Sequence, residues 1–292
     1  MELPLALVLG PLMEAVEEAA EMTAAQGFAA AAFLLVVGAS MIPLFRRSSA
    51  WLLERTPGRA AAFQARDLAI VAVVFILGQA LVAESYRLWI GAEELDIQSL
   101  GVVPALGLSA ASQGLTVAVV LGLALRRPRG AAAVGLRDLT PGKRGVFALA
   151  WYLLSIPSLM GLGALTAAIY LAQGGEPPVQ DTAVLVADGL NEHPVLIFAL
   201  VALVIPLLEE VIFRGFLLEL LVSRLGVPVG IFLSSGLFAI LHGEAVFLPI
   251  FGLAVVLAGV KLRTRSLYAS WGIHAIHNGL TTLLITGGAL PG

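Results

Sequence analysis

The sequence has no cysteine, few charged residues and few histidines. Among its 292 residues, none is Cys, 13% are charged and four are His. The absence of cysteine excludes disulfides, thiolate metal sites and a cysteine nucleophile. The charged fraction is about half that of a typical soluble protein, and 59% of the residues are hydrophobic. The composition therefore excludes an ordinary soluble globular protein and indicates a polytopic membrane protein of the all-α class.

Other familiar signals are also absent. The chain contains no H-E-x-x-H zinc motif and no detectable internal repeat, and its first residues lack a basic region before the apolar stretch. We therefore expect no cleaved signal peptide, and we interpret residues 1–23 as an outside segment that could lie in the membrane interface. The net charge of -3 gives no indication of a nucleic-acid partner.

Hydrophobic runs long enough to cross a bilayer recur along the chain. We expect eight transmembrane helices, at about 24–45, 68–90, 102–125, 146–172, 194–221, 227–243, 245–262 and 267–288. The sixth and seventh are the least separated, because only Gly243 and Glu244 break the apolar pattern between them.

Basic residues are confined to alternate connections between these helices. Of the 17 basic residues, 15 lie in the connections after the first, third, fifth and seventh helices, and the other connections are acidic. The positive-inside rule then places the basic loops in the cytoplasm and both termini outside. The arginine-rich composition, with only two lysines, is typical of a GC-rich genome, so we expect a multi-pass protein of a prokaryotic cell membrane.

The turn-rich stretch at 174–178 divides the chain into two halves. We predict a four-helix N-terminal membrane region at 24–172, an outside linker at 173–193, a four-helix catalytic core at 194–288 and a short tail at 289–292. The second half holds nearly all of the ionisable residues expected inside the membrane, so chemistry is expected there.

The most unusual stretch is Ile205 to Arg214, where three ionisable residues interrupt an apolar run. Each charge at the bilayer centre costs about 2.5 to 3.5 kcal/mol on insertion scales, so such groups are compensated and usually functional. On an α-helix Glu210 and Arg214 are four residues apart and can pair. Glu209 points about 100° away from Glu210, and its carboxylate is left free.

Three of the four histidines fall within the last three predicted helices. His242 shares a helix face with Phe238, and His274 shares a face with Asn278, since each pair is four residues apart. Polar groups in membrane helices avoid lipid, so we expect these faces and Glu209 to converge. A carboxylate and a histidine that hold a water, opposite a histidine and an amide that donate hydrogen bonds, can hydrolyse an amide.

These three motifs resemble those of the CAAX protease and bacteriocin-processing family of intramembrane endopeptidases. The resemblance covers about residues 194–288 and rests on three motifs in order: Glu209-Glu210-x-x-x-Arg214, Phe238-x-x-x-His242 and His274-x-x-x-Asn278. The first four predicted helices resemble no family.

The resemblance implies that Glu209 and His242 activate the water and that His274 and Asn278 form the oxyanion hole. The supporting pair would be Glu210 and Arg214. It also implies a membrane-associated or lipidated peptide or protein as substrate, in contact with the lipid bilayer. The family has been described both as zinc-dependent and as glutamate-dependent. We expect no obligatory metal, with zinc on Glu209, His242 and His274 as the alternative.

Two other functions use the same residues. A transporter or ion channel could carry ions or protons along Glu209, His242 and His274, and a catalytically inactive member could act as a scaffold or immunity protein. The oligomeric state is left open. We interpret His277 as a packing residue and His193 as a surface residue.

One geometric difficulty arises from the helix lengths. At 1.5 Å per residue, His242 lies near the outer end of its helix, whereas His274 lies about 10 Å from the cytoplasmic end of its own. A short, tilted or deeply starting sixth helix would bring them together, and the glycines and the proline at its start, Gly226, Pro228 and Gly230, allow one.

Overall fold

The computed structural model describes residues 23–40, 63–95, 100–128, 130–136, 142–177 and 181–286, and these residues form helices, turns and loops without a β-strand. The predicted all-α polytopic membrane fold is confirmed. The predictions for residues 1–22 and for the tail at 289–292 lie outside this range, as do the basic residues at 46, 47, 55, 59, 129 and 137.

Among the described residues of the first half there are four α-helices, and each lies in a range where the sequence predicts one. They are α2 (Ala24–Ser40), α4 (Ala65–Ile90), α5 (Val102–Leu125) and α6 (Gly142–Ala172), with the short 3₁₀ helix η1 (Gly130–Ala133) between the last two. Gly91 ends α4 with a φ of 69°, a left-handed conformation that glycine adopts without strain.

The second half begins with α7 (Asp181–Glu192), followed by one continuous helical path from Pro194 to Leu225, here called the motif helix. Its parts are α8 (Pro194–Ala199), the π-helical η2 (Leu200–Val204), α9 (Ile205–Glu210), the π-helical η3 (Val211–Leu217) and α10 (Leu218–Leu225). The remaining elements are α11 (Val227–Ile240), the 3₁₀ helix η4 (Glu244–Val246), α12 (Phe247–Thr264) and α13 (Leu267–Thr286).

Helix α7 lies in the stretch from 173 to 193 that the sequence predicts to be a linker. Val186 and Leu190 are four residues apart and therefore share one face of the helix. Both are buried and pack with Ile197 at the start of the motif helix. This small apolar contact explains why the polar stretch folds as a helix against α8.

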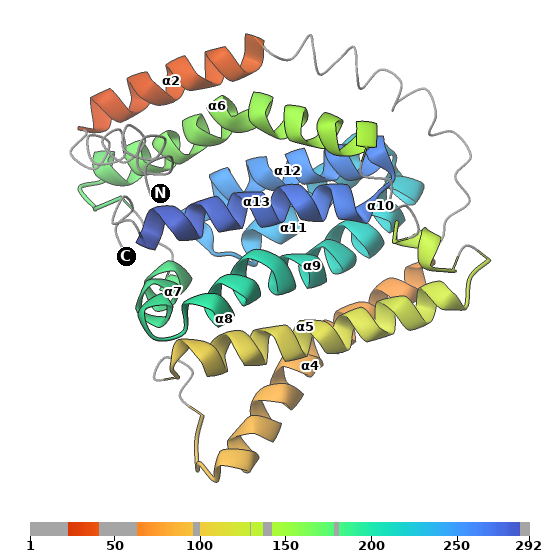
Figure 1. The fold of residues 1–292 in the computed structure, drawn as a ribbon. Coiled ribbons are helices and arrows are strands. Elements are labelled where there is room, and N and C mark those ends of the chain that lie inside the picture. The colour runs from red at the N-terminus through yellow and green to blue at the C-terminus, as the bar shows by residue number, and fades with distance from the viewer. Residues whose placement is uncertain are drawn as a thin grey trace, which may run out of the picture.

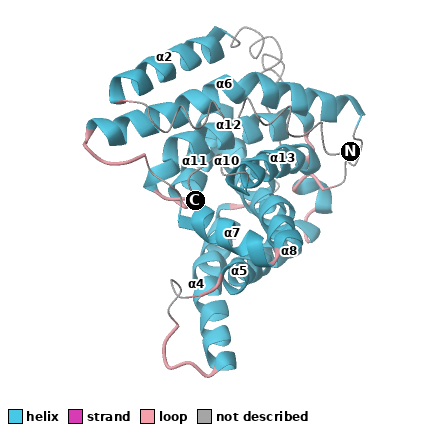
Figure 2. Cartoon of the chain, turned by 60° about the vertical axis from the view of Figure 1, so that its left-hand side comes forward, coloured by secondary structure: helices cyan, strands magenta, loops and turns pink. Residues whose placement is uncertain are grey.

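The helices form layers around the motif helix (Figure 1). Helices α2 and α6 pack along each other on one side, α11, α12 and α13 lie in the centre, and α5 with the tilted α4 closes the other side. The motif helix runs between the central helices and α5, so its charged residues lie in the interior of the bundle. The rotated view in Figure 2 shows α7 and α8 beside the end of α5.

Five of the described helical segments are long and apolar enough to cross a membrane. They are Ala65–Ile90, Val102–Leu125, Gly145–Ala172, Pro194–Leu225 and Glu244–Thr264. Their outer faces expose large apolar side chains such as Ile76, which is 65% exposed, and Trp89, which is 80% exposed, as expected for surfaces in contact with lipid. The chain is therefore a multi-pass membrane protein; the count of eight spans and the orientation stay predictions.

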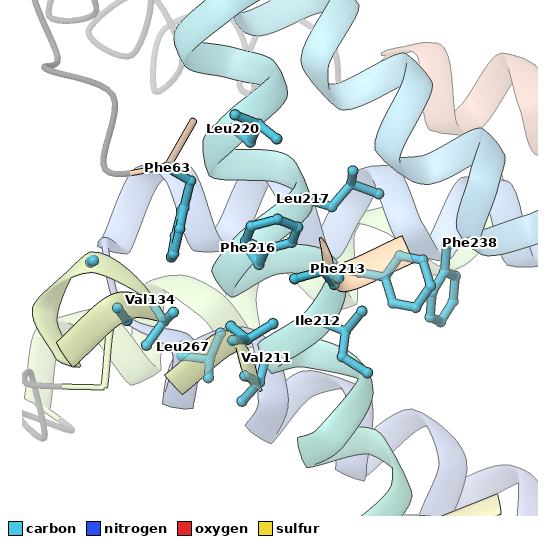
Figure 3. Packing of buried hydrophobic residues seen from close by; sticks show 14 of the residues in the cluster. Phe63, Val134, Val211, Ile212, Phe213, Phe216, Leu217, Leu220, Phe238 and Leu267 are labelled. Carbon is cyan, nitrogen blue, oxygen red and sulfur yellow. The ribbon is translucent and has the colours of Figure 1, made fainter. Parts of the chain in front are cut away.

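The connection at 130–136 folds back beneath the end of α13 that begins at Leu267. Val134 is buried, and the carbonyl of Gly135 accepts a hydrogen bond of 3.0 Å from the Leu267 N–H. Gly135 has a φ of 89°, and a Cβ there would lie 2.9 Å from the Lys261 side chain. Figure 3 shows Val134 and Leu267 beside Val211. A segment of the first half thus supports the base of the second.

Candidate active site

The motif helix presents its carboxylates between two π-helical segments. Such segments shift the register of a helix and often occur at functional sites. In η2 the Ile205 N–H bonds to the carbonyl of Leu200, five residues earlier. The next residue, Pro206, has no N–H, so the carbonyl of Val201 has no donor in this register. The side chain of Asn278 from α13 donates to this carbonyl at 3.1 Å.

Glu209 lies between the imidazoles of two other helices. One carboxylate oxygen is 3.9 Å from Nε2 of His242, and the other is 3.7 Å from Nε2 of His274. These separations are too long for direct hydrogen bonds. The side chains of Glu209 and His242 keep 14% and 22% of their surface exposed, so neither group is fully enclosed by the protein.

His242 is held in one orientation by its own helix. Its Nδ1 is 2.7 Å from the carbonyl oxygen of Phe238. A carbonyl oxygen can only accept a hydrogen bond, so Nδ1 carries the proton. In the neutral imidazole Nε2 is then unprotonated, and this is the nitrogen that faces Glu209. His242 can therefore accept a proton from a group held between the two side chains.

His274 is held by Glu210. Its Nδ1 is 3.1 Å from a Glu210 oxygen, and the same oxygen is 3.0 Å from Nη1 of Arg214. All three side chains are buried. The i,i+4 ion pair predicted from the sequence is thus present, and it has a third member. The Glu210 carboxylate accepts a hydrogen bond from the Nδ1–H of His274, so in the neutral ring Nε2 carries no proton. Nε2 can therefore donate a hydrogen bond only when the ring is protonated at both nitrogens.

Phe238 packs against each part of this arrangement. Its ring lies 4.2 Å from the Arg214 guanidinium carbon, 4.3 Å from the His242 ring and 5.9 Å from the His274 ring. Phe213 meets it edge-on at 5.0 Å (Figure 3). A cation over an aromatic face is stabilised by about 2 kcal/mol or more when desolvated. Phe238, which is fully buried, therefore fixes the positions of the charged and titratable groups around it.

The predicted difficulty of bringing His242 and His274 together is resolved by where two helices begin. Helix α11 is short and starts directly after α10, where a Cβ on Gly230 would lie 2.6 Å from Val222. From Leu225 back to Glu209 is about 24 Å of helix, and from Val227 to His242 is about 22 Å, so both residues reach the same depth.

Helix α13 begins deeper in the bundle than α10 ends. Its first residue, Leu267, packs in the same buried cluster as Val211 and Phe216. Seven residues further, about 10 Å along the helix, His274 is level with Glu209. The sequence indicated a short sixth helix, and the structure adds the deep start of the last one.

The other histidines take different places. His277 lies about 60° around α13 from His274, and its Nδ1 is 3.0 Å from the Tyr152 hydroxyl of α6. His193 is exposed before α8. Neither Tyr152 nor the interaction of Asn278 with the motif helix was expected from the sequence, because both contacts join segments far apart in the chain.

Among the described residues, no group of three or more His, Asp or Glu side chains is spaced to hold a metal ion. The alternative set of Glu209, His242 and His274 has suitable donor atoms, and both imidazoles have an acceptor at Nδ1, as metal ligands usually do. The need for a metal therefore stays open to experiment.

We expect Asn278→Ala to lower both stability and activity. Loss of the amide leaves the partly buried Val201 carbonyl without its donor, which costs about 1 kcal/mol, and it releases the helix that carries Glu209. Thermal unfolding in detergent and the rate of peptide cleavage measure the two effects. Asn191→Ala, at an exposed amide on α7, is the control, and equal behaviour of the two variants would contradict this role.

The fold and the site define an all-α membrane protein with a carboxylate and two imidazoles gathered inside its helical bundle. Residues 191–280 match the family model described as Type II CAAX prenyl endopeptidase Rce1-like. This part of the chain is thus similar to an Rce1-like domain, which confirms the resemblance to the CAAX protease and bacteriocin-processing family and supports an intramembrane endopeptidase in general. No curated protein and no solved structure matches the chain.

Proposed function

We propose that this protein is a glutamate-type intramembrane endopeptidase that cleaves membrane-associated peptides or proteins, with a lipidated C-terminal segment as the preferred substrate class. The observation that carries the proposal is the placement of the Glu209 carboxylate between Nε2 of His242 and Nε2 of His274. The Rce1-like domain at 191–280 supports the reaction class. The apolar outer faces of the helices suit a substrate that reaches the protein through the lipid.

In this mechanism Glu209 and His242 share the activation of one water molecule. The water lies between the carboxylate and the unprotonated Nε2 of His242, and its proton passes to one of them as its oxygen attacks the scissile carbonyl carbon. The proton is then delivered to the nitrogen of the leaving amine as the C–N bond breaks. The products are a new carboxylate and a free amine, so the reaction needs no other reactant.

His274 and Asn278 stabilise the oxyanion that forms during the attack. His274 donates from Nε2 while its Nδ1 is held by Glu210, and this requires the doubly protonated ring. Asn278 has two N–H bonds, of which one serves the Val201 carbonyl, and the other is available to the oxyanion. Glu210 and Arg214 position His274 and do not touch the substrate.

The test is cleavage of a quenched fluorescent peptide that ends in a farnesylated Cys-aliphatic-aliphatic-X sequence, with purified protein in liposomes. We expect wild type to cleave it and His242→Ala to lose about 10²–10⁴-fold in kcat/KM, as for loss of a general base. His193→Ala changes an exposed imidazole and is the matched control. Equal rates for His242→Ala and wild type would contradict the proposed role of His242.

A chelator separates the two mechanisms proposed for such a site. We expect the rate to be unchanged after prolonged incubation with a zinc chelator. Inactivation by the chelator, with recovery on adding back zinc, would instead make Glu209, His242 and His274 metal ligands. A farnesylated peptide and its unmodified counterpart, compared at equal concentration in the membrane, test the preference for a lipidated substrate.

A further inference from the structure

The buried interior next to the site contains polar atoms that have no hydrogen-bond partner among the described residues. The side-chain atoms concerned are the Ser235 hydroxyl, both terminal nitrogens of Arg214 and one oxygen of Glu210. Nη1 of Arg214 meets Glu210 at the distance of an ion pair but not with the alignment of a hydrogen bond. Buried polar groups are almost always hydrogen-bonded, so these atoms call for an explanation.

Ser235 is a buried residue of α11, a helix that packs against the motif helix and against α12. It is three residues before Phe238 and seven before His242, so the three side chains share one face of the helical path. Side chains on a helix lean toward its N-terminus, and the ring of Phe238 therefore covers the turn that contains Ser235. Ser235 is only 2% exposed.

The Arg214 guanidinium lies on that same ring. Its central carbon is 4.2 Å from the ring centroid of Phe238, and the neighbouring Phe213 meets Phe238 edge-on at 5.0 Å. The unused N–H groups of Arg214 and the unused hydroxyl of Ser235 thus belong to two elements that pack together, on either side of the Phe238 side chain in the contacts given above. Guanidinium groups can only donate and a hydroxyl oxygen can accept, so the two are chemically complementary.

We propose that Ser235 is a positioning residue, whose hydroxyl accepts a hydrogen bond from one water molecule that in turn accepts a hydrogen bond from the Arg214 guanidinium. This contact completes a chain from Ser235 through Arg214 and Glu210 to His274, and the chain holds Nε2 of His274 toward Glu209. The inference rests on the proposed function for its catalytic consequence, but the contact itself concerns the stability of the bundle.

A comparison of Ser235→Thr with Ser235→Val measures the effect of the hydroxyl alone, because threonine and valine have nearly the same shape and only threonine keeps the hydroxyl. We expect the threonine variant to keep at least half of the wild-type kcat. The valine variant should lose about tenfold in kcat with KM changed less than twofold, because an interaction that acts only through His274 is felt in the transition state. Ser234→Val is the matched control, since that buried hydroxyl already donates to the Ile231 carbonyl of its own helix.

The stability of the same variants tests the contact without relying on cleavage. We expect Ser235→Val to lower Tm by about 3–8 °C in the wild-type background and to have no effect when Arg214 is replaced by methionine and Glu210 by glutamine. Equal losses for the threonine and valine variants, or an unchanged effect of valine in the second background, would overturn the inference. Absence of any cleavage by wild type would instead count against the proposed function and leave the stability result to decide the role of Ser235.

Discussion

Replacing Glu209 with glutamine is expected to abolish peptide cleavage while the protein stays folded. Glutamine has nearly the same shape as glutamate but cannot take the proton of the attacking water, and general bases contribute about 10²–10⁴-fold to rates. Glu209 also faces both imidazoles at 3.7 to 3.9 Å, so loss of its charge removes two electrostatic contacts at once. We therefore expect kcat/KM to fall by at least about 10³-fold.

The stability of Glu209→Gln is the necessary companion measurement. The Glu209 side chain is partly exposed and forms no close ion pair, so Tm should change by less than about 3 °C. Glu192→Gln, at an exposed position at the end of α7, controls for loss of one negative charge. A Glu209→Gln enzyme that retains a tenth of the wild-type rate would assign proton transfer to another residue.

Replacing Glu210 or Arg214 with alanine is expected to have the largest effect on stability. Both side chains are buried, with 0% and 3% of their side-chain surface exposed. Removing one partner leaves an uncompensated charge in the bundle, which costs about 3–5 kcal/mol and should lower Tm by about 10 °C. Activity should be lost as well, because His274 is no longer held at Nδ1.

The double variant Glu210→Gln with Arg214→Met separates the two effects. It removes both charges and keeps the volumes, so much of the lost stability should return, as for other buried ion pairs replaced together. Cleavage should stay at least about tenfold below wild type, because a neutral amide cannot match the carboxylate at His274. Thermal unfolding and cleavage of the double variant are compared with those of the two single alanine variants. Recovery of full activity in the double variant would show that Glu210 has no part in orienting His274.

The sequence predicts the composition of the site because ionisable residues are costly inside a membrane. Glu209, His242 and His274 stand out against a long apolar background, and they can avoid lipid only by facing one another. Helices lie at the predicted positions within the described residues for a similar reason, since an apolar segment in lipid must form its backbone hydrogen bonds internally; the count of eight membrane spans stays a prediction. The local sequence pattern and the membrane environment are therefore sufficient to predict which residues form the site and where the helices lie.

The arrangement of the site depends on contacts that no local pattern records. The change from α- to π-helical turns around α9 and the use of Asn278 to serve the Val201 carbonyl arise only when α13 packs on the motif helix. The ion pair between Lys261 and Glu219, at 2.8 Å, and that between Asp67 and Arg127, at 2.6 Å, join residues far apart in the sequence. Such pairs follow from tertiary packing and were not predicted.

The packing of Gly135 links the two halves of the chain. Gly135 comes from the first half, yet its carbonyl serves the first N–H of α13 and its lack of a side chain makes room for Lys261. Val134 beside it contacts Gly215 on the motif helix. The region that matches the family, 191–280, therefore packs against a segment that lies outside it. The candidate hydrolytic residues of the matched region thus rest in part on this outside segment, so the residues at these contacts constrain the sequences of both halves together.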